Sequence, residues 1–333
     1  MQQYIIRRIL LNFLVIFLVA TMVFLVLRID TGTVVSRAAG SCTSGVDLSN
    51  PEAGRQECIK IARAELGLDN SLPEQFADYM SNLAKGDFGR SFKSKNPVSD
   101  EIKERAAPTI ELGLLQIMVA IVVALPIGIV SAIRQDSWVD YLLRFFSIAF
   151  LGIPQFVVAI LVIIITSRYA GGTVLPDWFG PHQNYPSITE DPLQNLKIMF
   201  APALIGGLAT GAVIMRFLRS QMLEVLRQDY VRTAWSKGLK ERVVIVRHAL
   251  KNALIPVLTL IGILLGSIVS GNVVLENIYG IPGIGNYIVF AVAQNPDFPV
   301  IQGIVIVVAI TLVFINLIVD IAYGWLDPRI RYS

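Results

Sequence analysis

The side chains that could carry out chemistry in this sequence are few and lie far apart. The signatures of phosphate-binding loops, zinc hydrolases, dithiol redox centres and serine hydrolases (GxxxxGK[ST], HExxH, CxxC and GxSxG) do not occur. The two histidines, His182 and His248, are predicted below to lie on opposite sides of a membrane, which excludes a histidine-based metal site. We therefore expect that this chain is not an enzyme, binds no metal or cofactor, and has no ATPase site of its own.

Both cysteines, Cys42 and Cys58, lie in the long polar segment Asp30–Glu111. The topology below places this segment outside the cytoplasm, where thiols can oxidise. Closing a loop of this length would stabilise the fold by roughly 3 kcal/mol. We predict a disulfide between Cys42 and Cys58, with two free thiols as the alternative.

Ionisable residues next to the apolar stretches are the remaining candidates for chemistry. Glu111, Arg144 and Asp320 lie near the ends of such stretches, where a side chain reaches the membrane interface. An enzyme inside the membrane would need at least two polar groups converging at mid-depth, and the sequence shows none. We interpret these charges as interfacial or structurally paired rather than as a proton relay.

The apolar stretches indicate a membrane protein. Hydrophobic residues make up 54% of the sequence and charged residues 16%, too few charges to cover a soluble surface. Crossing a hydrocarbon core of about 30 Å takes roughly 20 apolar residues in a helix. Six uncharged runs of suitable length are predicted to cross: Ile9–Leu27, Leu112–Ile133, Phe145–Ser167, Ile198–Met215, Asn252–Leu275 and Phe298–Val319.

A seventh uncharged stretch, Asn277–Pro296, is not predicted to cross. Its first half contains glycines and Pro282, which disfavour a continuous helix. Only Tyr287–Ala293 is continuously apolar, and that run is too short to span a bilayer. We expect a re-entrant or interfacial piece here.

Lysine and arginine set the orientation. Segment 216–251 carries nine of them against three acidic residues, whereas Glu276–Asp297 has none. Six spans then place both termini and segment 216–251 in the cytoplasm. The first apolar run resembles a secretion signal, but Cys42 lies too far behind it for a lipoprotein cleavage site, so we expect an uncleaved span.

This topology divides the chain into three parts. They are the first transmembrane helix (1–29), an extracytoplasmic insert (30–111) and a five-helix core (112–333) that includes the cytoplasmic loop 216–251. Within the insert, helical spacing predicts short helices in 51–69 and 72–89.

One short helix is predicted inside the basic loop. Asp229 is a suitable N-cap, and Gly238 is suited to the left-handed position just past a helix end. About two turns of helix are too short to be stable alone, so this helix must pack against its own spans or a partner. Taken alone, the segment is equally an ordinary cytoplasmic loop with positive charge.

Several ordered motifs bear on that choice. YVRTAWSKGL, followed by RHALKNALIPVLT, resembles the cytoplasmic coupling loop of permease subunits of binding-protein-dependent ABC importers. Arg232, Thr233, Ala234 and Gly238 stand at the Glu-Ala-Ala-x-x-x-Gly positions of that loop, so the motif's glutamate is missing here. This departure is typical of the dipeptide, oligopeptide and nickel branch. RAAPTIEL, ENIYGIPGIG and WLDPRIR resemble other segments of the B-type subunit of that branch.

The resemblance implies a fold and partners. The fold is an all-α polytopic membrane protein, with six transmembrane helices of the type I ABC importer permease (MetI-like) fold and an extracytoplasmic insert. The partners are a second, homologous permease, two ATPase subunits that bind ATP and Mg, an external solute-binding protein and membrane lipid, but no nucleic acid. The location is a bacterial or archaeal cytoplasmic membrane.

The resemblance also implies a function. Di- or oligopeptides are the expected solutes, with nickel or oligosaccharides as alternatives. A secondary transporter is less favoured, because the sequence shows neither buried carboxylates nor a clear inverted repeat. ATPase coupling is expected at Asp229, Tyr230, Arg232, Thr233, Ala234, Ser236, Lys237 and Gly238, and an outer gate or turn at Glu276, Pro282, Gly283 and Gly285.

Overall fold

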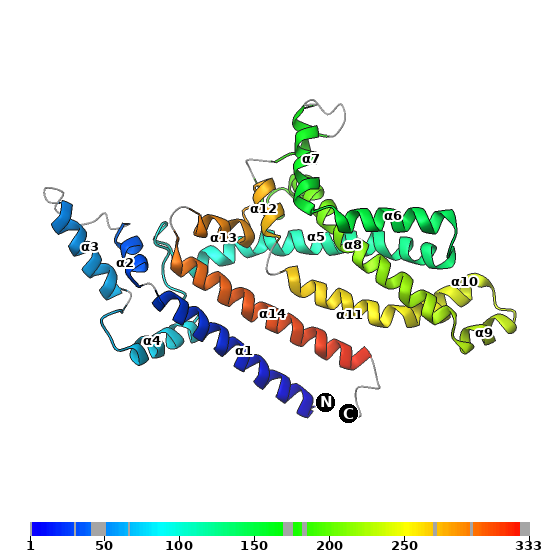
Figure 1. Ribbon diagram of the computed structural model, residues 1–333, viewed down its shortest axis with the longest axis horizontal. Coiled ribbons are helices and arrows are strands. Elements are labelled where there is room, and N and C mark those ends of the chain that lie inside the picture. The colour runs from blue at the N-terminus through cyan, green and yellow to red at the C-terminus, as the bar shows by residue number, and fades with distance from the viewer. Residues whose placement is uncertain are drawn as a thin grey trace. The chain divides into compact units, whose positions relative to one another are not determined.

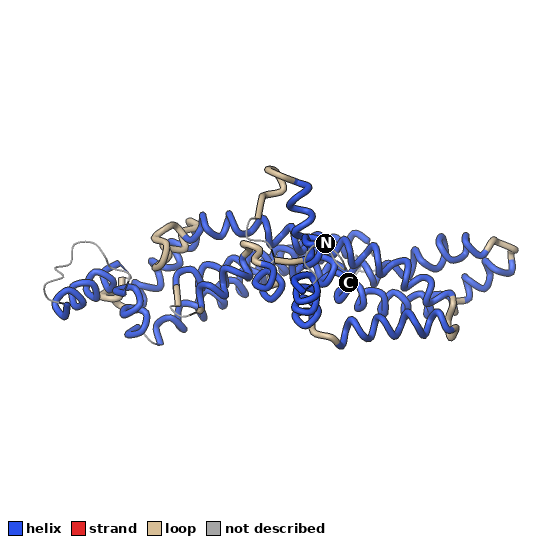
Figure 2. The backbone as a smooth tube through the Cα atoms, turned by 90° about the horizontal axis from the view of Figure 1, so that it is seen from above, coloured by secondary structure: helices blue, strands red, loops and turns tan. Residues whose placement is uncertain are grey.

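The computed structural model describes residues 2–29, 31–40, 51–65, 67–168, 176–181, 185–268, 272–293 and 296–326. These residues are almost entirely helical (Figure 2), as predicted for an all-α protein. The chain divides into two compact units. We call residues 108–285 and 314–333 the core unit, and residues 2–107 and 286–313 the amino-terminal unit.

Five helical stretches are long and apolar enough to cross a membrane, and a bent pair would make a sixth. They are α1 (Gln2–Ile29), α5 (Val98–Ile133), α8 (Pro192–Leu226), α14 (Phe298–Leu326) and the run Glu241–Gly266. That last run passes through α10 (Glu241–Val243), the π-helical segment η2 (Val244–Leu250) and α11 (Lys251–Ile268). The first, second, fourth and sixth predicted spans are confirmed as single helices.

The third predicted span is not one helix. It is split into α6 (Trp138–Gly152) and α7 (Gln155–Arg168), which meet at 94°. The cause is Pro154, which lacks an N–H and forces the preceding residue out of the helical region. Ile153 is accordingly extended, with φ −88° and ψ 119°. The predicted span Phe145–Ser167 therefore corresponds to this bent pair rather than to one straight helix.

The fifth predicted span extends too far. Helix α11 ends at Ile268, and Val273–Tyr279 forms a separate helix, α12, capped by the Asn272 side chain. The next helix, α13 (Ile284–Val292), has nine residues and is about 14 Å long, too short to cross. This confirms that Asn277–Pro296 does not form a span.

Helix α8 lies at the centre of the core unit, where it packs against α6 and α11 (Figure 1). Its inward face carries Leu218 and Met222, which are fully buried among alanines of α5 and α11. The Ser147 hydroxyl donates to the carbonyl of Ala212 across the α6–α8 contact, at 3.1 Å. Small residues and interhelical hydrogen bonds of this kind hold helices together where no water is present.

The amino-terminal unit contains α1 and three short helices, α2 (Thr31–Gly40), α3 (Pro51–Glu65) and α4 (Leu72–Ala84). The two helices predicted in the insert are confirmed as α3 and α4, whereas α2 was not predicted. Phe76 of α4 packs edge-on against Phe17 and Phe24 of α1. Aromatic contacts of this geometry contribute about 0.5–1.5 kcal/mol beyond the area they bury.

A second contact in this unit joins distant parts of the sequence. The carboxylate of Asp297 is buried, and it accepts hydrogen bonds from the Ser91 hydroxyl at 2.7 Å and from the N–H groups of Phe92 and Lys93, each at 3.1 Å. The loop that precedes α5 is thus fixed to the residue that precedes α14.

Candidate functional site

Helix α9 (Asp229–Ser236) follows α8 almost directly and occupies the predicted position of the short helix in the basic loop. Its N-cap is Gln228, so the prediction that Asp229 caps the helix is wrong by one residue. Asp229 is exposed and lies 3.8 Å from Arg232, an ion pair that contributes little because water screens it.

The end of α9 is as predicted. Gly238 has φ +74°, and its N–H donates to the carbonyl of Trp235 at 2.9 Å. Most residues with a side chain are strained in this left-handed conformation, so glycine allows the chain to leave the helix and begin α10.

The inner face of α9 packs on its own chain. Val231 and Ala234 are buried against Val244 of η2, with Val225 and Leu226 of α8 beside them. Full burial of one valine contributes roughly 1.5–3 kcal/mol, enough to hold a helix that could not form alone. The Ala234 side chain therefore contacts its own chain, whereas the resemblance suggested close contact with a partner.

A hydrogen bond ties the same helix to α11. The Asn252 side chain donates to the Tyr230 hydroxyl at 3.0 Å and to the carbonyl of His248 at 2.8 Å. Since Val244 and Asn252 lie on one continuous helical run, α9 is fixed to the base of α11 at two points. Figure 1 shows α9 and α10 together at the ends of α8 and α11.

Several apolar side chains of this charged loop are exposed. Tyr230 and Trp235 are each 44% exposed, and Leu239, Val243 and Val246 are exposed nearby. Exposed apolar patches mark contact sites. We call these five residues the α9 patch. Sequence reasoning singled out Tyr230 but missed Trp235, although a tryptophan in a polar loop was itself a signal.

The remaining predicted residues of this helix do not form one polar cluster. The Thr233 and Ser236 hydroxyls donate to the carbonyls of Asp229 and Arg232 in their own helix, at 2.9 and 3.1 Å. Lys237 is the C-cap residue and is exposed. These groups are available for surface contacts, and no pair of them forms a catalytic arrangement.

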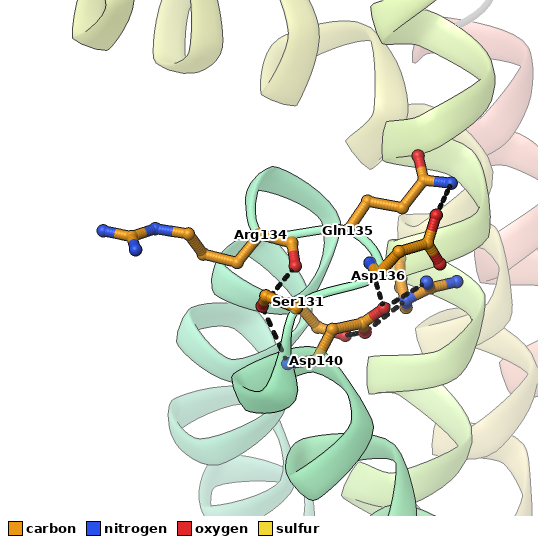
Figure 3. Close-up of polar contacts among 7 residues, drawn as sticks. Ser131, Arg134, Gln135, Asp136 and Asp140 are labelled. Atoms are coloured by element: carbon orange, nitrogen blue, oxygen red, sulfur yellow. Dashed lines mark hydrogen bonds and ion pairs between the residues drawn. The ribbon is translucent and has the colours of Figure 1, made fainter.

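A buried ion pair lies elsewhere in the core unit, and no motif in the sequence indicated it. Asp140, at the start of α6, is fully buried and accepts two hydrogen bonds from the Arg219 guanidinium of α8, at 2.9 and 2.7 Å. Its carboxylate also accepts from the Ser131 hydroxyl and from the N–H of Asp136, in the turn between α5 and α6 (Figure 3). This network, the α6–α8 brace, joins three helices.

The predicted outer turn is compact and centred on a buried carboxylate. Glu276, in α12, accepts a hydrogen bond from the Thr109 hydroxyl at 2.9 Å, and Thr109 in turn accepts from the N–H of Ile284 at 2.8 Å. A Cβ on Gly283 would lie 2.3 Å from Glu276 Oε2, and one on Gly285 would lie 2.8 Å from it. Glycine is required at Gly283 because the carboxylate and the Thr109 hydroxyl occupy the space. It is required at Gly285 because the Val273 backbone, with Cα 2.7 Å from such a Cβ, occupies the space together with the carboxylate.

The structure therefore brings Glu276, Gly283 and Gly285 together, while Pro282 contributes only to the turn between α12 and α13. Thr109, in the RAAPTIEL segment, was missed as a site residue. Burial raises the pKa of the neighbouring Tyr279 hydroxyl to about 12. The turn is held by buried hydrogen bonds and close packing around the Glu276 carboxylate.

A second polar cluster involves Glu111, one of the charges considered above. The Tyr185 hydroxyl donates to Glu111 Oε2 at 2.8 Å, and the fully buried Asn195 amide donates to both. Burial and the nearby carboxylate raise the pKa of Tyr185 above its usual value. Glu111 is thus a paired structural group, as interpreted from the sequence.

The predicted disulfide is tested at only one of its two cysteines, Cys58. Cys58 is buried beside Val35 and Ala39 and is disulfide-bonded. Cys42 lies outside the described residues, so the pairing of Cys42 with Cys58 stays a prediction.

Comparison with known proteins adds to this geometry. Residues 124–332 match the family model described as "Binding-protein-dependent transport system inner membrane component". Residues 1–113 match the model described as "Binding-prot-dependent transport system membrane comp, N-term". The chain is 34% identical, over 333 residues and 100% of both chains, to proteins named glutathione transport system permease protein GsiC. These come from Escherichia coli (strain K12), Shigella dysenteriae serotype 1 (strain Sd197) and Shigella flexneri serotype 5b (strain 8401).

Proposed function

The chain belongs to the family of inner membrane components of binding-protein-dependent transport systems and is a permease subunit of an ABC importer. We propose that it imports short peptides, and that the ATPase subunits drive its motion through α9. The importer also includes a second permease, ATPase subunits and a binding protein. The proposal has two parts, which are the class of solute and the contact through which the ATPases move this permease.

The solute class is supported by the relatives that span the whole chain, whose printed names specify glutathione transport. Glutathione is itself a short peptide. Di- or oligopeptides are therefore the proposed solutes, and the separate binding protein selects among them. Nickel and oligosaccharides were alternatives raised by resemblance, and no feature of the described residues favours them.

The attachment of α9 is the observation that carries the coupling proposal. Its inner face is buried on Val244, and Tyr230 bonds to Asn252, so a displacement of α9 is passed directly to α11. The side chains of the α9 patch are exposed beside these contacts. An ATPase surface that receives Trp235 and Tyr230 would bury both aromatic rings, and buried aromatic side chains dominate the free energy of binding at protein interfaces.

The other residues of α9 have supporting roles in this proposal. Arg232 and Lys237 are exposed cations that would meet acidic groups on an ATPase. Ala234 and Gly238 set the packing and the end of the helix. Thr233 and Ser236 lie on the exposed surface of α9, where a crosslinker attached to either side chain would reach a bound ATPase.

The transport cycle follows from a difference in binding between two states. ATP would close the two ATPases and move α9, together with α11, from an inward-facing to an outward-facing arrangement, and hydrolysis would reverse the motion. The ATPases can shift this equilibrium only by binding α9 more tightly in one state than in the other. The outer turn around Glu276 would form a rigid stop at the opposite end of the pathway.

The experiment is reconstitution of the complete importer in proteoliposomes with ATP inside. Labelled glutathione and dipeptides, presented with the binding protein, should accumulate only with ATP, and they should still do so after an ionophore removes ion gradients. A crosslinker at Ser236→Cys should capture an ATPase subunit. Uptake that follows the ion gradient instead, or a Ser236 probe that never reaches an ATPase, would refute the coupling proposal.

A further inference from the structure

The junction between α6 and α7 is an interruption in a helix at the depth of the membrane. A cavity of about 180 Å³ shows which part of α8 lies beside the junction. Phe150, Ile153 and Gln155 line this cavity together with Ile205 and Leu208 of α8. These two residues of α8 lie in the middle of the predicted span Ile198–Met215. The 15 residues of α6 also measure about 22 Å, which ends the helix inside a hydrocarbon core about 30 Å thick.

The junction leaves backbone groups without the partners that a continuous helix would give them. Pro154 has no N–H to donate to the carbonyl of Phe150. The 94° turn also separates the N–H groups of Gln155 and Phe156 from the carbonyls of Leu151 and Gly152. Within the described residues no backbone hydrogen bond joins these groups. Residues 151–154 are all exposed, so the open backbone lies on the surface of the core unit.

Contact with lipid is unfavourable for the exposed backbone of the α6–α7 junction. Each unsatisfied backbone group costs several kcal/mol in hydrocarbon, so irregular backbone at this depth is found against protein or along a water-filled cavity. Water is disfavoured as well, because the exposed side chains around the junction are apolar. Leu151 and Ile153 are exposed at the junction itself. Along α7 they are followed by an exposed apolar stripe made of Phe156, Ile160, Leu161 and Ile164.

We infer that the α6–α7 junction and the apolar stripe of α7 form a contact surface for the second permease subunit. That partner is an apolar transmembrane surface of the same family, and a hydroxyl or amide side chain on it would complete the free carbonyls of the junction. This inference rests only on the pairing of two permeases in the importer, and not on the solute or on α9.

The test is photo-crosslinking in the complete, reconstituted importer. A benzophenone amino acid at Leu161 of α7, which is 52% exposed, should form an adduct with the second permease that mass spectrometry identifies. Met118 of α5, in the same unit and 55% exposed, is the matched position, and its adducts with the second permease should be at least fivefold fewer. Adducts at Leu161 with lipid alone, or with another segment of the same chain, would overturn the inference.

Two further measurements separate the remaining explanations. The double variant Leu161→Ala/Ile164→Ala should lose at least tenfold of the co-purified second permease, while Leu114→Ala/Met118→Ala should retain it. Equal losses would count against a specific surface. Rapid labelling of Ile153→Cys by a membrane-impermeant maleimide in the intact importer would show an aqueous lining, and would also overturn the inference. Failure of the Ser236 crosslink to an ATPase would leave all these results unchanged.

Discussion

The Arg219 guanidinium donates two parallel hydrogen bonds to the Asp140 carboxylate, from Nε to Oδ1 at 2.9 Å and from Nη2 to Oδ2 at 2.7 Å. The Asp140 side chain is fully buried, and that of Arg219 is 16% exposed. The pair connects the first turn of α6 to α8 a few residues before α8 leads into α9. This link joins the α5–α6 turn to α8.

Removing one partner of this pair should destabilise the core unit strongly. Asp140→Ala leaves the Arg219 charge without its buried counterion, and losses of about 3–5 kcal/mol are typical for such changes. We expect a clear fall in the unfolding temperature of the purified importer. Asp100→Ala, which removes an exposed ion pair with Lys103, is the control and should change little. An unchanged unfolding temperature in Asp140→Ala would contradict the bracing role.

The α9 patch should matter for coupling but not for folding. Trp235→Ala removes a half-exposed ring, which leaves the Val231–Val244 contact intact. If this ring is buried by an ATPase, a loss of about 2 kcal/mol or more is expected, equivalent to at least a tenfold drop in ATPase affinity. Co-purification of the ATPases and ATP-driven uptake measure the effect. The similarly aromatic and exposed Trp138, at the start of α6, provides the control in Trp138→Ala, which should bind ATPases normally.

The sequence predicted the membrane class and the carboxyl-terminal end of α9 because both depend on local features. Hydropathy over about 20 residues identifies a span, and a glycine with positive φ identifies the end of a helix, as Gly238 does. The same local features do not reveal how the chain breaks at Pro154, since a proline in an apolar run can either bend a helix or divide it. Hydropathy alone does not distinguish these outcomes.

The polar networks depend on pairs far apart in the chain. Asp140 and Arg219 are separated by 79 residues, and Thr109 and Glu276 by 167. Arg219 was counted only as one cation of a basic loop. Which buried acid meets which base is set by helix packing, and no motif in the sequence encodes it. The resemblance did locate Glu276, Gly283 and Gly285, but not the reason for the glycines.

A charge placed on the inner face of α9 should uncouple transport. Ala234→Asp would bury a carboxylate among the apolar side chains of Val231, Val244 and Leu226, and burying a charge in such surroundings is costly. We expect α9 to detach and ATP-driven uptake to be lost, while the chain stays inserted with its other spans intact. Thr189→Asp introduces the same charge at an exposed position outside the α8–α11 loop and should retain most uptake. Comparable uptake by the two variants would show that the packing of α9 is not needed.

The predicted disulfide has a direct test. Peptide mass spectrometry without reduction should recover Cys42 and Cys58 in one linked peptide, since the chain contains no other cysteine. Loss of a bridge across a loop of this length should cost roughly 3 kcal/mol, so reduction should lower the unfolding temperature of the insert. Two free thiols in the native protein would refute the pairing.

The outer turn should tolerate changes at Thr109 only if the hydroxyl is kept. This hydroxyl donates to Glu276 and accepts from the N–H of Ile284, so Thr109→Val removes two buried hydrogen bonds. Each lost hydrogen bond costs about 0.5–1.5 kcal/mol or more, whereas Thr109→Ser preserves both of them. Gly283→Ala should be at least as severe, because the new Cβ would lie 2.3 Å from a Glu276 carboxylate oxygen. Thermal unfolding and peptide uptake should rank the variants with Thr109→Ser near the unmodified protein and the other two well below it. Equal behaviour of Thr109→Ser and Thr109→Val would show that this buried network contributes nothing to the turn.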